Sequence, residues 1–163
     1  MTAPRIQFTV YGDPAGQGNL KGTRHGKLRH ANGDELLAWR GKVRQAAIDH
    51  TDAHEWRGEK KGPCRECGYY RTQHAQILGP VRLEAVLTVV KPKSVRTEWP
   101  ISRGTSDWDH YARAIGDALT GIAYADDSQV IDGRAIVTYP HIHPDALHVP
   151  GAVIKLWPIE GDL

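Results

Sequence analysis

The sequence predicts a small α/β domain of the α+β type, in which a mixed sheet packs against two main helices. Its 163 residues suit a single domain spanning 1–163. Apolar residues make up 40% of the chain and charged residues 25%, which is ordinary globular usage and excludes a largely disordered chain. Segments with an apolar residue at every second position alternate with segments of helical period, so strands and helices share the domain.

Four segments have the composition of strands. RIQFTVY at 5–11 alternates apolar and polar residues, which predicts a half-buried strand. The same alternation returns in VRLEAVLTVV at 81–90. Two further strands are expected at about 129–139 and 149–157.

Two segments carry a helical period. The first is 35–50, with Asp34 as the expected N-cap. The residues that recur at roughly this period are Leu36, Leu37, Arg40, Val43, Ala47 and Ile48. The second is 108–120. Its predicted buried face consists of Tyr111, Ala114, Ile115, Ala118 and Leu119.

The segments between these elements are predicted to be irregular. Residues 12–33 are basic and rich in Gly, which is typical of a loop or a loose hairpin. Residues 51–79 are polar, hold both cysteines and lack an amphipathic period, so they are interpreted as an insertion. Residues 91–106 are again polar and are predicted to be a loop.

Charge is distributed unevenly along the chain. Residues 1–100 contain 17 Lys and Arg against 10 Asp and Glu, whereas residues 101–163 contain 4 against 9. A basic part could hold a polyanion and an acidic part could hold metal cations. Chance segregation of solvated surface charge remains the alternative at this point.

Neither a membrane span nor an export signal is predicted. No run of 18 uncharged apolar residues occurs. The opening MTAPRIQFTVYGD lacks an apolar region followed by a small-residue cleavage site. A cytoplasmic location without membrane contact is therefore expected.

The most informative stretch is 105–132, because it combines six aspartates with a single basic residue, Arg113. The aspartates are Asp107, Asp109, Asp117, Asp126, Asp127 and Asp132. Clustered carboxylates repel one another unless a cation neutralises them, and hard divalent cations prefer oxygen ligands. A strand that returns after the helix could bring Asp127 beside Asp107 and Asp109. Helix capping, turn formation and ion pairs along an exposed helix face are the structural alternatives.

Other nucleotide and cation motifs do not fit. A calcium loop that starts at Asp107 would need Asp or Asn at position 111 and Gly at 112, where the chain has Tyr111 and Ala112. The Gly-rich segment has the order Leu-Lys-Gly-Thr, which misplaces the lysine of a phosphate loop.

The segment SDWDHYARAIGDALTGIAYADDSQVIDGRAIVTY resembles the RusA family of Holliday junction resolvases. The stretches that match the family pattern are Asp107-Trp108-Asp109, Asp117-Ala118-Leu119 and Asp126-Asp127-Ser128-Gln129-Val130. The opening FTVYGDPAGQG is also similar to the family's first strand and its Gly/Pro turn. The resemblance implies a homodimeric endonuclease that depends on Mg²⁺ (or Mn²⁺) and cuts branched DNA such as a four-way junction.

The resemblance also implies site residues. The catalytic, metal-binding carboxylates carry over onto Asp107, Asp109 and Asp127, with Asp126 as a neighbouring candidate ligand. The family's lysine falls on Arg113, which would hold a phosphate but cannot readily donate a proton.

A second departure from the family pattern is His110, which replaces an Asn. The basic segment would grip the DNA backbone with little sequence selectivity, although a solvated loop is equally compatible with its composition. The residues expected to contact DNA are Lys21, Arg24, Lys27, Arg29 and Arg113.

Cys64 and Cys67 form a C-x₂-C pair that is suited to one tetrahedral Zn²⁺. His54 and His74 would complete a closed, structural four-ligand site, and His50 is an alternative fourth ligand. The segment has too few apolar residues to fold alone, so a metal would explain its order. A redox pair and two free thiols are the alternatives.

Three functions are compatible with these patterns. The first is a nuclease that resolves four-way junctions. The second is a zinc-containing DNA-binding module that has lost catalysis, which the His110 and Arg113 departures favour. The third is a nuclease that acts on flaps or forks.

Overall fold

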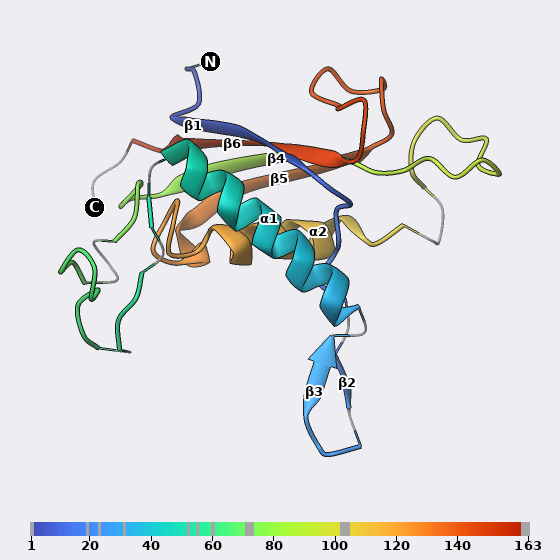
Figure 1. Ribbon diagram of the computed structural model, residues 1–163. Coiled ribbons are helices and arrows are strands. Elements are labelled where there is room, and N and C mark those ends of the chain that lie inside the picture. The colour runs from blue at the N-terminus through green and yellow to red at the C-terminus, as the bar shows by residue number, and fades with distance from the viewer. Residues whose placement is uncertain are drawn as a thin grey trace.

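The structure is a computed structural model of the chain, and its labelled elements are shown in Figure 1. It describes residues 2–18, 20–22, 24–30, 32–51, 53–54, 56–59, 61–70, 74–101 and 105–160. The side chains of residues 20, 21 and 28–30 lie outside this description.

The elements follow the predicted order of strands and helices. They are β1 (Ile6–Tyr11), β2 (Leu20–Gly22), β3 (Leu28–His30), α1 (Gly33–Thr51), β4 (Val81–Thr88), α2 (Trp108–Leu119), the 3₁₀ turn η2 (Asp127–Gln129), β5 (Val130–Thr138) and β6 (Gly151–Pro158). The predicted α+β class with two main helices is confirmed. The Gly-rich basic segment contains the short β2–β3 hairpin, which is the second of the two forms expected for it.

The four long strands form one mixed sheet in the order β1-β6-β4-β5. β6 pairs antiparallel with both β1 and β4, whereas β4 and β5 run parallel. Parallel neighbours need a crossover connection, and α2 lies on the connection between β4 and β5. This crossover brings the Asp-rich stretch of the chain, which surrounds α2, against the edge strand β5.

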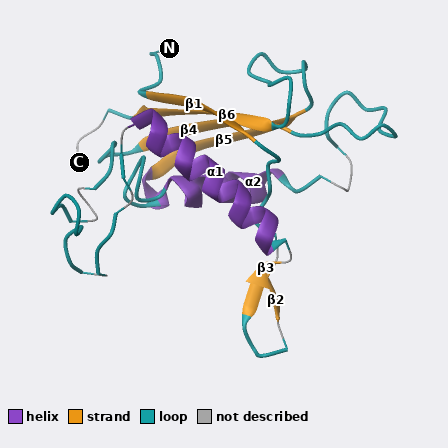
Figure 2. Cartoon of the chain, in the orientation of Figure 1, coloured by secondary structure: helices purple, strands orange, loops and turns teal. Residues whose placement is uncertain are grey.

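One face of the sheet packs against both helices and forms the core (Figure 2). All five residues predicted for the apolar face of α2 are buried. The face of α1 differs from the prediction: Leu37 is 68% exposed, whereas Trp39 is buried. The indole fills the space between the helix and the sheet because α1 is rotated so that Leu36, Trp39, Val43 and Ala47 point inward.

The start of α1 also differs from the prediction. The helix begins at Gly33, and the Leu36 backbone amide donates to the Asn32 carbonyl at 3.0 Å. Asn32 therefore occupies the position before the helix, and Asp34 lies in the first turn, where a carboxylate still complements the helix dipole.

Two segments extend from the core. The β2–β3 hairpin projects from the end of the molecule where α1 begins, and the polar connection from α1 to β4 loops out at the other end of α1 (Figure 1). In the described parts of the chain, neither helix combines the length and apolarity needed to span a bilayer.

Candidate functional site

The N-terminal end of α2 gathers three potential cation ligands. Asp107 is at the N-cap position but makes no side-chain capping hydrogen bond, so the capping alternative does not account for its carboxylate. Ligand atoms of Asp107, Asp109 and His110 all lie within 4.8 Å of one another. Asp107 is exposed and the other two are half-buried, which leaves the group accessible from solvent.

The loop after β1 packs against this end of α2. The Gln17 backbone amide donates to the His110 carbonyl at 2.9 Å, and the Asn32 side-chain amide donates to the Gly16 carbonyl at 2.9 Å. A Cβ atom at Gly16 would lie 2.9 Å from the Cβ atoms of His110 and Ser106. The Gly/Pro turn that resembles the family's first turn thus packs against the acidic end of the helix and helps to hold it in position.

Arg113 lies one helical turn beyond the acidic group. Its guanidinium donates to the Asp109 carboxylate at 2.8 Å, and 62% of its side chain is exposed. Arg113 also lines a cleft of about 270 Å³ between α2 and β5, together with Trp108 and Asp127. Arg113 therefore lies between the acidic end of α2, to which it is hydrogen-bonded, and the cleft beside the start of β5.

Asp127 reaches this cleft from the η2 turn but is not part of the group formed by Asp107, Asp109 and His110. The expected return of the chain does occur, because β5 follows the turn and packs along α2. It carries Asp127 to the cleft that Trp108 and Arg113 of α2 also line. Trp108 lies between Asp107 and Asp109 in the sequence.

The two neighbouring aspartates of the turn have different environments. The Asp126 carboxylate accepts a hydrogen bond from the Ser128 backbone amide at 3.0 Å. The Gln129 side-chain oxygen accepts from the Ala125 and Asp126 amides at 2.8 and 3.2 Å, which completes a capping box. Asp126 thus caps the turn, and exposed Asp127 lies next to it.

Gln129 holds the same turn against the segment that precedes β4. Its side-chain nitrogen donates to the Ile77 and Gly79 carbonyls at 3.0 and 2.9 Å. One side chain therefore joins two loops that lie about 50 residues apart in the sequence.

A second, polar cleft of about 390 Å³ lies on the other side of Asp127. Arg40 and Arg44 line it from α1, and the Arg40 guanidinium is 3.5 Å from the Asp117 carboxylate. Arg44 donates to the Ala118 carbonyl at 3.1 Å. No functional role was predicted for these arginines, although their spacing of four residues places both on one side of α1 and was a usable signal.

The hydroxyl of Tyr124 is buried beneath the turn and donates to the Gly116 carbonyl at 2.9 Å. Burial raises the pKa of Tyr124, and the negative charges of Asp127, Asp117 and Asp126 raise it further. This phenol stays neutral and serves as a structural support for the turn.

The basic residues of the hairpin are only partly described. Arg24 and Lys27 are exposed in its connecting turn. Lys21 and Arg29 are opposite each other in the β2–β3 register, and their side chains lie outside the described residues.

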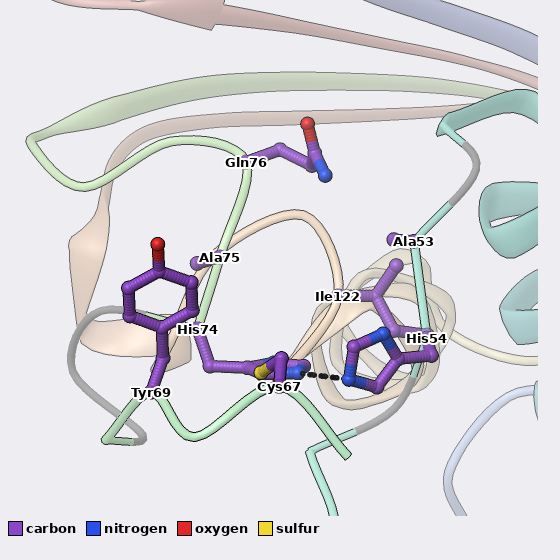
Figure 3. A pocket seen from close by; sticks show the side chains of 8 residues that line it. All are labelled: Ala53, His54, Cys67, Tyr69, His74, Ala75, Gln76 and Ile122. Atoms are coloured by element: carbon purple, nitrogen blue, oxygen red, sulfur yellow. Dashed lines mark hydrogen bonds between the residues drawn. The ribbon is translucent and has the colours of Figure 1, made fainter. Parts of the chain in front are cut away.

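The connection from α1 to β4 forms a second cluster of ligand atoms. The ligand atoms of this cluster all lie within 4.8 Å of one another, and they belong to His54, Cys64, Cys67 and His74. The two His Nε2 atoms are 3.1 Å apart, and Figure 3 shows both rings directed toward each other with Cys67 beside them. His50 is not part of this group.

The surroundings of Cys64 in this cluster favour the thiolate form of its side chain. Burial raises the pKa of its thiol, but hydrogen bonds from the Arg57, Cys67 and Glu66 backbone amides and from His54 outweigh burial. Together they lower the pKa of Cys64 from 9.0 to about 6.

An accessible carboxylate pair next to arginines is chemically suited to hold a divalent cation beside a phosphate. The sequence profile of the endodeoxyribonuclease RusA family matches residues 65–146, just over half of the chain. The protein therefore belongs to the RusA endodeoxyribonuclease family. It is also similar to the uncharacterized protein YqaN of Bacillus subtilis (strain 168), with 29% identity over 138 residues that cover 78% of this chain and 82% of the relative.

Proposed function

We propose that the protein is an endonuclease that uses Mg²⁺ or Mn²⁺ to hydrolyse phosphodiester bonds in branched DNA, with the four-way junction as its substrate. One observation carries this proposal. The Asp107 carboxylate makes no capping hydrogen bond to α2, and it lies beside Asp109 and near the exposed Arg113. Because the chain belongs to an endodeoxyribonuclease family, we assign this arrangement to the hydrolysis of DNA phosphodiesters.

The donor set fits a hard divalent cation. Asp107 and Asp109 offer carboxylate oxygens, and their mutual distance of at most 4.8 Å approaches the span of about 4 Å across an octahedral Mg²⁺ site. These two residues would hold the cation. His110 adds a nitrogen, which Mn²⁺ accepts more readily than Mg²⁺ does. When bound, the cation would activate water and neutralise charge on the phosphate.

Arg113 would hold a non-bridging oxygen of the phosphate. At present it pairs with Asp109, but an exposed ion pair of this kind contributes only about 0–1 kcal/mol. Arg113 can therefore exchange from the carboxylate to a phosphate at little cost, which also frees Asp109 for the cation. Its planar guanidinium suits two phosphate oxygens better than a proton transfer.

Asp127 is proposed as the third catalytic carboxylate, in preference to Asp126. The Asp126 carboxylate is engaged in the cap of the turn, whereas Asp127 lines the cleft that Arg113 also lines. Arg40 and Arg44 on the other side of Asp127 extend the positive charge along the path of a DNA strand.

The basic hairpin is proposed to bind DNA backbone outside the catalytic site, through Lys21, Arg24, Lys27 and Arg29. Contacts to phosphates supply affinity without sequence information, as a structure-selective nuclease requires.

A homodimer is proposed as the active form. A four-way junction presents strands related by a two-fold axis, and a C₂ dimer would place one acidic site at each of two symmetric phosphates. Light scattering on the free protein and on its junction complex measures this directly, and a monomer in both states would contradict it.

The test is cleavage of a synthetic four-way junction by wild type and by Asp109→Asn, with Mg²⁺, with Mn²⁺ and with a chelator. Wild type should nick the junction only with a divalent cation. The variant should bind the junction with similar affinity and lose nicking. Flap, fork and duplex substrates of the same arm sequences are compared side by side.

Asp49→Asn is the matched control, because Asp49 is an exposed aspartate on α1 whose side chain accepts from Gln45. This variant should cut like wild type. Equal cutting by Asp109→Asn would contradict the site, and faster cutting of flaps or forks would replace the junction as substrate.

A catalytically impaired DNA-binding module is the second candidate. The observation that favours it is the Arg113–Asp109 ion pair, which neutralises one of the carboxylates where the family pattern has a lysine. Junction binding without cleavage in both Mg²⁺ and Mn²⁺ would support this candidate.

A further inference from the structure

The second cluster of ligand atoms is independent of the acidic end of α2. His54 and the two cysteines come from the connection between α1 and β4, and His74 follows in the same connection. The cluster combines two imidazoles with two thiol groups, a donor set that selects soft or borderline metals rather than Mg²⁺.

The distances inside the cluster match the edges of a tetrahedron around zinc. Zn–N bonds of about 2.0–2.1 Å and Zn–S bonds of about 2.3 Å give edges of roughly 3.4 Å between two nitrogens and roughly 3.6 Å between nitrogen and sulfur. The His54 and His74 Nε2 atoms are 3.1 Å apart, and Cys64 Sγ is 3.5 Å from His54 Nε2. The two rings meet edge to face at 79°.

The backbone around the cysteines has the form of a metal-binding turn. The Gly68 amide donates to the Cys64 carbonyl at 2.9 Å, and Gly68 has a φ of 78°, where a side chain would be strained. The Arg57 amide is 3.4 Å from Cys64 Sγ and donates to it. Amides directed at sulfur stabilise the thiolate form that a metal requires.

Apolar burial cannot account for the order of this connection. Among its described residues between α1 and β4, only Cys64, His74 and Ile77 are buried. Two of these three side chains belong to the cluster, so a central metal would take the place of a hydrophobic core.

We propose that His54, Cys64, Cys67 and His74 bind one Zn²⁺ in a closed, structural site. Four protein ligands leave no open position for substrate, so the zinc has no catalytic role.

The proposed zinc site lies next to the segment that holds the η2 turn. Shortly after His74, the Gln76 and Ile77 amides donate to the Ile122 and Ala123 carbonyls at 3.3 and 2.9 Å. Ile77 is also one of the two anchors of Gln129. The zinc therefore orders the strip of chain that holds the η2 turn in place.

The experiment begins with metal analysis of protein purified without chelator. Wild type should contain about one zinc per chain, and replacement by Co²⁺ should give the visible absorption of a tetrahedral thiolate site. Cys67→Ser and His74→Asn should lose most of the bound zinc. Asp109→Asn should retain it, which separates this site from the acidic one.

His50→Asn is the matched control, because His50 lies in the last turn of α1 outside the cluster. It should keep its zinc, and loss of zinc in this variant would overturn the ligand set. Since ligand variants can fail to fold, a thiol reagent is also titrated into wild type, where modification of both cysteines should release the zinc.

Two results on wild type would overturn the proposal. One is protein free of zinc that also fails to bind Zn²⁺ or Co²⁺ under reducing conditions. The other is a Cys64–Cys67 disulfide in the purified protein, which would favour the redox alternative. Removal of zinc should also increase hydrogen exchange of the Ile77 amide, a readout that does not depend on nuclease activity.

Discussion

Gly16 occupies a position where no larger residue fits. A Cβ atom there would lie 2.9 Å from side-chain carbons of both Ser106 and His110. These two residues lie at the N-terminal end of α2. Gly16→Ala should therefore destabilise the protein by about 1–3 kcal/mol, as expected for overpacking. Chemical denaturation measures the free energy of unfolding, and junction cleavage should fall in parallel because His110 and its neighbours must shift.

The control for this prediction is Gly41→Ala. Gly41 is exposed in the interior of α1, and a Cβ there meets nothing within 4 Å. The substitution should raise the free energy of unfolding by about 0.5–1 kcal/mol, because alanine favours the helix. Equal stability effects at both glycines would show that crowding at Gly16 is not the cause.

Arg113 lies where the sequence resemblance places a lysine in the family pattern. Arg113→Ala should lower the rate of junction cleavage on the order of 10²-fold, since one donor to a charged phosphate oxygen is lost. Arg113→Lys restores the family residue and should keep cleavage within about tenfold of wild type. Single-turnover cleavage measures both rates, and an alanine variant as fast as wild type would remove Arg113 from the site.

The η2 turn shows how one element depends on another that is distant in the sequence. Gln129 accepts from two amides of its own turn and donates to two carbonyls ahead of β4. Each such hydrogen bond contributes about 1 kcal/mol net, and a buried group left without a partner costs more. The orientation of Asp127 therefore depends on the segment that contains Ile77.

Gln129→Ala should destabilise the protein by about 2–4 kcal/mol and lower cleavage more than junction binding. Gln129→Glu keeps the acceptor for the turn but places a carboxylate oxygen, which cannot donate, against the Ile77 and Gly79 carbonyls, so it should be at least as destabilising as alanine. Gln45→Ala is the control, because among the described residues the Gln45 side chain donates to exposed Asp49, at the surface of α1. It should change stability by less than about 0.5 kcal/mol, and denaturant titration compares all three.

At the scale of the whole molecule, positive charge is found both in the projecting hairpin and in the arginines beside the η2 turn. Arg24→Ala combined with Lys27→Ala should weaken junction binding and reduce the slope of log K against log salt by about 2. Arg5→Ala should leave that slope unchanged, because Arg5 precedes β1 at the end opposite the hairpin (Figure 1). Binding isotherms at several salt concentrations test this, and an unchanged slope in the double variant would exclude the hairpin from DNA contact.

Local patterns in the sequence were enough to predict the class of the fold, the order of its elements and the buried face of α2. These follow from local periods of apolar residues, which reflect backbone geometry and burial over short distances. It also identified the C-x₂-C pair and the Asp-rich stretch as chemistry-bearing segments, because ligand spacing within one turn is a local property.

Contacts between side chains that are distant in the sequence became visible only in the folded chain. The rotation of α1 that buries Trp39 depends on the shape of the sheet beneath it, and the arrival of Arg40 and Arg44 beside Asp127 depends on how α1 and α2 pack. The position of Asp127 likewise depends on Gln129, which holds the η2 turn against the segment before β4. Such contacts come from packing between elements, which no local pattern of residues encodes.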